Sequence, residues 1–188
     1  KLAFVRRLEG QTDLRRREII LEWLEGHGVA FELHRYDRPD PGVNILFGLP
    51  GRGREILAVA HYDAFYLSPG ANDNASSIAM LLEFFLEMRA RPIRHPLKMA
   101  IFDDEEPDAT RGWMGMRGSR AYVRTFGTQQ ILAVYDFEMC GMGDAVGIWP
   151  VTDFNAKSFL LENIRKVLDA EGIYHERVGS LPAFYADY

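Results

Sequence analysis

The chain has 188 residues, a formal net charge of −5 and 47% hydrophobic residues. This length and composition predict a single domain, residues 1–188, with a sizeable core, and exclude an intrinsically disordered chain. The acidic balance argues against nucleic acid as the main partner, because phosphate binding needs a basic surface. No apolar run reaches the ~18 residues of a membrane-spanning helix, so we expect no membrane partner.

Two local features of the composition carry little information about function. The single cysteine, Cys140, excludes an internal disulfide framework, and we expect it to be buried and inert. A chain without disulfides favours the cytoplasm only weakly over secretion, so the compartment stays open. The run Arg15-Arg16-Arg17 is interpreted as a solvated helix face, which is the usual place for such a run.

The first forty residues predict a helix followed by a strand. Asp13 can cap a helix that has apolar side chains at positions 19, 20, 23 and 24 and ends near Gly26. Residues 31–34 alternate as a half-buried strand does, and residues 43–47 form a second strand after a turn. Residues 56–60 are an unbroken apolar run, which is typical of a central strand covered on both faces.

Helices and strands alternate in the rest of the chain. The predicted elements are helix 76–88, strand 97–102, helix 118–125, strands 131–135 and 145–149, and a last helix over about 160–168. This alternation predicts an α/β fold with a largely parallel sheet. In such sheets, ligands bind at the carboxyl ends of the strands.

Three predicted strands run directly into side chains that can bind a metal. These ends are His61-Tyr62-Asp63, Asp103-Asp104-Glu105-Glu106 and Asp136-Phe137-Glu138, and a further acid, Asp73, precedes the first buried helix. Carboxylates at the edge of a core are costly unless they are paired or bind a cation. Three converging acidic ends therefore predict a shared cation.

The types of residue at these ends suit zinc. Zinc accepts imidazole nitrogen and carboxylate oxygen, and in a His-x-Asp triplet the aspartate can fix the imidazole tautomer. Of two adjacent glutamates, one can bind metal while the other faces the reacting water as general base. One aspartate can also bridge two metal ions, because its carboxylate has two oxygens.

Five segments, in this order, resemble the co-catalytic zinc exopeptidases, a family that includes bacterial leucyl aminopeptidases and glutamate carboxypeptidase II. They are Ala-His-Tyr-Asp at 60–63, Pro-Gly-Ala-Asn-Asp-Asn-Ala-Ser at 69–76, Glu-Glu at 105–106, Gly-Ser-Arg-Ala-Tyr at 118–122 and Phe-Glu-Met-Cys-Gly at 137–141. The segment 69–76 is the most specific of the five. The similarity runs from about Val43 to Gly141 and weakly to the end.

The resemblance implies a three-layer α/β/α sandwich around a mostly parallel mixed sheet, two zinc ions and a peptide substrate cleaved at its N-terminus. It implies that His61, Asp73, Glu106 and Glu138 bind metal, with Asp73 bridging the two ions. Glu105 would be the general base and Asp63 would orient His61. Each of these residues also has a plain structural interpretation: His61 as a buried histidine, Asp73 as a helix cap, and Glu105-Glu106 as a solvated acidic loop like Asp103-Asp104.

The chain departs from the family pattern at two places. Glu138 stands where the family usually has aspartate, and the neighbouring Asp136 would compete for the role if a strand did not point it to the opposite face. The family's last ligand is a histidine beyond the final helix, and His175 comes too early to supply it. We therefore expect the natural protein to continue beyond Tyr188 and the domain of residues 1–188 to lack its C-terminal part.

Two other functions remain open. Glutaminyl cyclases share the implied fold, use one zinc ion and show a strand end like Phe102–Glu106. A non-catalytic scaffold that keeps the fold is the other alternative, although the complete His61 and Glu105-Glu106 set argues against it. The three remaining early histidines, His27, His34 and His95, are expected at the surface or in loops. An apolar loop with Trp113, Met114 and Met116 is interpreted as packing or as a lid over the substrate pocket.

Overall fold

A computed structural model of the chain describes residues 2–36, 41–108, 112, 114–148 and 159–177. Its backbone contacts divide the chain into two compact units, Lys1–Gly141 and Met142–Phe184, and each unit is described by itself. All six predicted site residues belong to the first unit. Within the described residues, no helix combines the length and the apolar character needed to cross a membrane.

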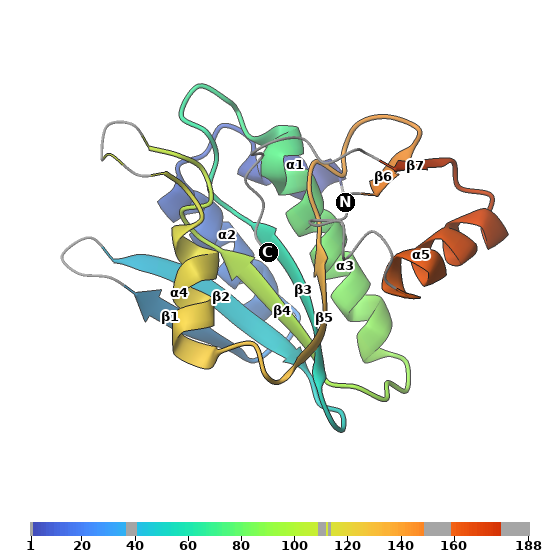
Figure 1. Cartoon of the computed structure of the whole chain (residues 1–188). Helices are drawn as coiled ribbons and strands as arrows, with labels where there is room; N and C mark the ends of the chain where they lie inside the picture. Colours follow the sequence, from blue (N-terminus) through green and yellow to red (C-terminus); the bar gives the residue numbers. More distant parts are fainter. Residues whose placement is uncertain (1, 37–40, 109–111, 113, 149–158, 178–188) are drawn as a thin grey trace. The chain divides into compact units, whose positions relative to one another are not determined.

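The first unit contains a five-stranded mixed sheet in the order β1-β2-β4-β3-β5 (Figure 1). The strands are β1 (Phe31–Tyr36), β2 (Gly42–Leu49), β3 (Glu55–His61), β4 (Leu97–Phe102) and β5 (Ile131–Asp136). β2 is antiparallel to both of its neighbours, whereas β3 is parallel to β4 and to β5. Four strands therefore run in one direction and only β2 is reversed, which confirms the mostly parallel mixed sheet.

Helices cover both faces of this sheet and complete three layers (Figure 1). One face packs against α1 (Leu2–Leu8), α2 (Asp13–Gly26) and α3 (Ser77–Arg89), which follows the short irregular helix η1 (Ala71–Ser76). The other face packs against α4 (Arg117–Phe126). The predicted α/β/α sandwich is therefore the architecture of this unit.

The central strands are unbroken apolar runs because both of their faces are buried. In β3, Ala58 and Ala60 belong to the core under α1, α2 and α3, whereas Leu57 and Val59 belong to the core under α4. This alternation is the two-residue period of a strand. β4 follows the same rule, and the two strands consequently deliver their last residues to the same edge of the sheet.

The second unit has its own small sheet. It contains β6 (Val146–Ile148), α5 (Phe159–Ala170) and β7 (His175–Arg177), and β6 pairs in parallel only with β7 in the described residues. The predicted strand at 145–149 and the last helix are both confirmed. β7 was not predicted, because three residues after a glycine turn give too short a pattern to recognise.

Several local expectations were wrong. Thr12, not Asp13, caps α2, since its Oγ1 accepts from the N–H of Arg15 at 3.3 Å. Arg16 is fully buried rather than solvated, and His34 is buried in β1, where Nε2 lies 3.0 Å from Thr125 Oγ1. Cys140 is exposed and not buried as expected. Partial desolvation of its thiol and the nearby Glu138 carboxylate nevertheless raise its pKa, which disfavours the reactive thiolate.

A buried amide joins three elements next to the acidic end of β4. Asn44 Oδ1 accepts from the N–H of Asp103 at 3.1 Å, and its Nδ2 donates to the carbonyl of Gly118 at 2.9 Å. Gly118 has to be glycine, because a Cβ there would lie 2.3 Å from the carbonyl oxygen of Asp103. Asn44 in β2 thus fixes the position of α4 against the segment that leads to Glu105.

We expect Asn44→Leu to lower the free energy of unfolding by about 1–3 kcal/mol, because it leaves the buried N–H of Asp103 without an acceptor. Urea unfolding followed by circular dichroism measures the loss. Glu32→Gln, on the exposed side of β1, is the control and should change the stability by less than about 0.5 kcal/mol. An equal effect of both substitutions would contradict the role assigned to Asn44.

Candidate metal centre

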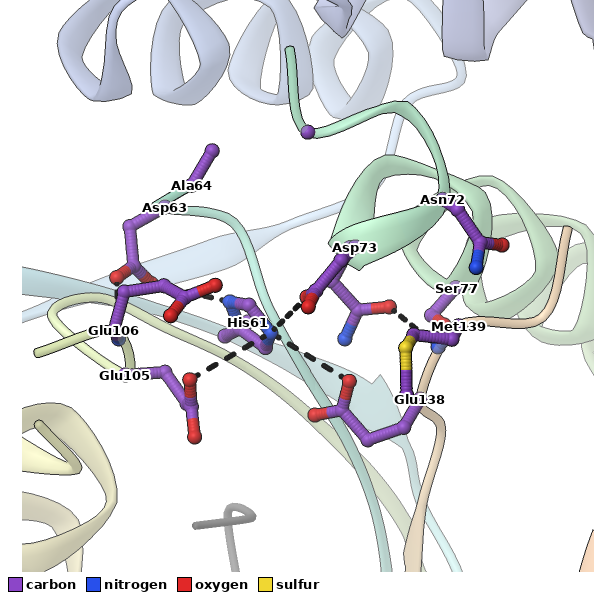
Figure 2. A network of polar contacts seen from close by, with 12 residues as sticks. His61, Asp63, Ala64, Asn72, Asp73, Ser77, Glu105, Glu106, Glu138 and Met139 are labelled. Atoms are coloured by element: carbon purple, nitrogen blue, oxygen red, sulfur yellow. Dashed lines mark hydrogen bonds and ion pairs between the residues drawn. The ribbon is translucent and has the colours of Figure 1, made fainter. Parts of the chain in front are cut away.

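His61, the last residue of β3, is buried and stands at the middle of a ring of carboxylates (Figure 2). Its Nδ1 lies 3.3 Å from Asp63 Oδ1. Its Nε2 faces three further acids, with Asp73 Oδ1 at 3.1 Å, Glu138 Oε2 at 3.6 Å and Glu105 Oε2 at 3.9 Å. The structure therefore brings together side chains from three strand ends and from η1, as the sequence predicted.

Asp63 is buried behind His61 and is held from its other side by the backbone. Its Oδ2 accepts from the N–H of Glu106 at 2.8 Å. Burial alone would raise the pKa of Asp63, but the contact with His61 and the backbone N–H groups outweigh burial, and the pKa is lowered. An ionised Asp63 keeps a proton on Nδ1 of His61 and leaves Nε2 to act as a metal ligand.

Asp73 lies in η1, where the chain departs from helical geometry. Asp73 and Asn74 have the non-helical φ/ψ pairs −104°/99° and −128°/28°, and the peptide bond between them is cis. Asn74 Nδ2 donates to the carbonyl of Phe137 at 3.0 Å, and its Oδ1 accepts from the N–H of Met139 at 3.2 Å. Asn74 therefore holds the backbone on both sides of Glu138, a role that the sequence patterns did not reveal.

Glu105 and Glu106 follow β4 in a turn that is tied down along its length. The carbonyl of Glu105 accepts from the N–H of Met116 at 2.9 Å, and Gly115 approaches so closely that a Cβ there would lie 2.3 Å from the same oxygen. The expectation that Asp103 and Asp104 form a solvated loop was wrong. Asp103 is buried and accepts from the N–H of Val43 at 2.8 Å, and Asp104 is paired with Arg117 at 2.9 Å.

Burial and mutual repulsion raise the pKa of both glutamates. Burial and the carboxylates of Asp63 and Glu138 raise the pKa of Glu105 to about 8, against the opposing effect of His61. Burial and the carboxylate of Asp73 raise the pKa of Glu106 to about 7. The same carboxylates raise the pKa of His61, although its burial acts in the opposite direction. The cluster therefore holds protons at neutral pH when no other cation compensates its charge.

The donor atoms fit a divalent cation. His61, Asp73 and Glu106 each offer a ligand atom, and these atoms lie within 4.8 Å of one another. Glu105 Oε1 and Glu138 Oε1 are buried and accept no hydrogen bond from the described residues. Buried acceptors of this kind are costly unless a cation or a donor satisfies them. Imidazole nitrogen with carboxylate oxygens is the ligand set of zinc and related metals.

Comparison with known proteins places this centre in a family. The profile of Peptidase family M28 matches residues 44–178, which include every residue of the cluster. The chain belongs to Peptidase family M28. This M28 chain is 34% identical over 68 residues to Aminopeptidase YwaD from Bacillus subtilis, a match that covers 36% of the chain and 13% of YwaD.

Solved structures share the fold of this M28 chain. A glutaminyl cyclase from an Acidobacteriales bacterium superposes with a TM-score of 0.79 at 19% identity, covering 99% of the chain and 72% of the cyclase. The Bacillus subtilis zinc aminopeptidase BSAP gives 0.63 at 22% identity, covering 80% of the chain and 37% of BSAP. LapB from Legionella pneumophila gives 0.67 at 16% identity, covering 99% and 54%. At these identities the likeness establishes the fold.

The side chain at position 138 lies beside His61 although it is one methylene longer than aspartate. Glu138 reaches within 3.6 Å of His61 Nε2, because Asn74 draws the backbone after β5 toward η1. The last ligand, expected beyond Tyr188, remains a prediction. The C-terminal residues 178–188, like Trp113, lie outside the described residues.

Protons and cations compete for the same oxygens, so we expect the apparent affinity for zinc to rise as the pH increases from about 6 to about 8. The sign follows from the raised pKa values of Glu105 and Glu106, since below these values the carboxyls are protonated and a cation must displace the protons. Calorimetric titration in two buffers of different ionisation enthalpy counts the protons released. An affinity that stays constant over this pH range would contradict the cluster as the binding site.

Proposed function

We propose that the chain carries the catalytic centre of a zinc-dependent aminopeptidase that hydrolyses N-terminal peptide bonds. The observation that carries the proposal is the buried acceptor Glu105 Oε1, which has no hydrogen bond in the described residues and lies beside a group of side chains that could hold a cation. Membership of Peptidase family M28 and the match to an aminopeptidase support the same conclusion. The match covers only 13% of that relative, so the activity is proposed for this centre and not transferred whole.

We propose that the ring of carboxylates holds two zinc ions. His61, Asp73 and Glu138 would bind one ion, and Asp73 and Glu106 would bind the other, so that Asp73 bridges them. When bound, such ions lower the pKa of a coordinated water and polarise the carbonyl of the scissile peptide. Asp63 would set the tautomer of His61 from behind, at 3.3 Å from Nδ1.

We propose Glu105 as the residue that moves the proton. Its carboxylate is buried, lies 3.9 Å from His61 Nε2 and has a raised pKa of about 8 before a cation is bound. Glu105 would therefore take a proton from the attacking water and deliver it to the leaving amine.

We expect Glu105→Gln to lower kcat by at least about 100-fold, because an amide cannot accept the proton, while zinc content stays near that of the wild type. The release of an N-terminal amino acid from a peptide measures kcat, and elemental analysis measures the zinc content. Glu106→Gln is the matched comparison, since removing a proposed ligand should lower zinc content as well. Wild-type turnover by Glu105→Gln would reject Glu105 as the base.

A single-zinc glutaminyl cyclase is the second candidate. The observation that favours it is the set His61, Asp73 and Glu106, which is sufficient for one ion, next to a cyclase-like strand end at Phe102–Glu106. The two reactions give different products from a peptide that begins with glutamine. A peptidase releases free glutamine and a shortened peptide, whereas a cyclase keeps the chain length and releases ammonia.

Mass spectrometry of the products, with zinc content per chain, separates the candidates, and we expect free glutamine and two zinc ions. Pyroglutamyl peptide with one zinc ion would support the cyclase. Absence of zinc even after zinc is supplied would reject both enzymes and leave the scaffold alternative.

A further inference from the structure

A buried arginine lies behind the metal centre and binds backbone carbonyls rather than the ligand side chains. Arg16 belongs to α2 and is fully buried. Nη1 donates to the carbonyls of Tyr62 at 2.9 Å and Asp63 at 3.4 Å. Nη2 donates to the carbonyls of Gly70 at 2.6 Å and Pro69 at 3.2 Å.

The fifth N–H of the guanidinium is also satisfied, since Nε donates to the carbonyl of Leu8 at 3.2 Å. A guanidinium has five N–H groups in one rigid plane, and here each of the five nitrogen-bound hydrogens has a carbonyl available. All five acceptors are backbone oxygens. Arg16 therefore holds the backbone of these segments through hydrogen bonds and does not pair with a single carboxylate.

The acceptors lie on the two segments that carry the proposed ligands. Tyr62 and Asp63 directly follow His61, and Pro69 and Gly70 lead into η1, which carries Asp73. Gly70 has a φ of +63°, and a Cβ there would lie 2.1 Å from Arg16 Nη2, so glycine lets the segment approach the guanidinium. Both segments are thereby set against one planar group, and His61 Nε2 and Asp73 Oδ1 come within 3.1 Å.

We propose that Arg16 is a positioning residue that sets the spacing between His61 and Asp73 by clamping the backbone at 62–63 and 69–70. The inference rests on the metal centre proposed above. The clamp fixes the ligands before a cation arrives, so less ordering accompanies binding. The positive charge of Arg16 itself does not attract the cation, so the effect must come from geometry, and a lysine that keeps the charge tests it.

We expect Arg16→Lys to weaken zinc binding about 10–100-fold, the range seen when a group that supports metal ligands is removed. An ammonium has three donors and no fixed plane, so it cannot serve five carbonyls. Competition with a chelator measures the zinc dissociation constant. Arg15→Lys, one residue earlier on the exposed face of α2 and paired with Glu18 and Glu22, is the matched control and should bind zinc like the wild type.

Amide hydrogen exchange on the metal-free protein supplies a second measurement that needs neither zinc nor activity. We expect the amides of residues 61–73 to exchange faster in Arg16→Lys, and the exchange rates in β2 and β4 to stay unchanged. This pattern distinguishes a lost clamp from general destabilisation. Wild-type zinc affinity together with wild-type exchange in Arg16→Lys would overturn the inference. If the wild-type protein binds no zinc, the proposed function fails, and the exchange alone decides whether Arg16 clamps these segments.

Gly70→Ala disturbs the same contact from the loop side and covers the case in which Arg16→Lys does not fold. Its Cβ would meet Arg16 Nη2, so we expect a similar loss of zinc affinity and similar faster exchange over 61–73. A folded Gly70→Ala protein with unchanged zinc affinity and unchanged exchange would also overturn the inference.

Discussion

The concentration of negative charge around His61 is the constraint on which the rest of this structure depends. Asp63, Asp73, Glu105 and Glu138 all lie within 4 Å of one imidazole ring. Two unit charges 4 Å apart interact with about 4 kcal/mol at the effective dielectric constant of a protein surface. Without a cation, this repulsion works against the fold and shows itself in the raised pKa values of Glu105 and Glu106.

The fold holds these charges together through backbone contacts that are independent of the charges themselves. The parallel strands β3, β4 and β5 end at one edge of the sheet, which supplies the approximate positions. Three buried side chains then fix the segments beyond the strands: Asn44 after β4, Asn74 after β5, and Arg16 after β3. Each binds backbone groups, so the segments stay in place whether the carboxylates are protonated, ionised or bound to a cation.

The sequence predicted β1 to β6 and the helices α2 to α5, because these elements leave strong patterns. Apolar runs predicted β3 and β4, and the resemblance of five segments to the zinc exopeptidases indicated the six candidate site residues, which the fold brings together around His61. The buried Arg16 was missed because a run of three arginines is usually solvated. The burial of Arg16 could nevertheless have been predicted, since residues 16, 19, 20 and 24 share one helix face and the last three are apolar.

Other features could not be read from the sequence for physical reasons. Asn74 and Asp103 act through backbone groups of segments far away in the chain, and a single chain carries no signal for such pairings. The departure of Asp73 and Asn74 from helical geometry depends on the same tertiary contacts. His34 lies on the edge strand β1 and is buried by contacts with α4, and only the fold determines how these two elements pack.

The charge of the cluster bears on the number of ions that the centre is proposed to hold. Five carboxylates, those of Asp63, Asp73, Glu105, Glu106 and Glu138, surround a neutral imidazole when His61 acts as a ligand. One divalent cation leaves three of these negative charges uncompensated, so at least one glutamate would keep the proton that its raised pKa indicates. Two divalent cations leave a single negative charge, which corresponds to an ionised Glu105 that is ready to accept a proton. The base proposed for peptide hydrolysis and the second zinc ion therefore support each other, and a centre with one ion fits better with a reaction in which Glu105 begins protonated.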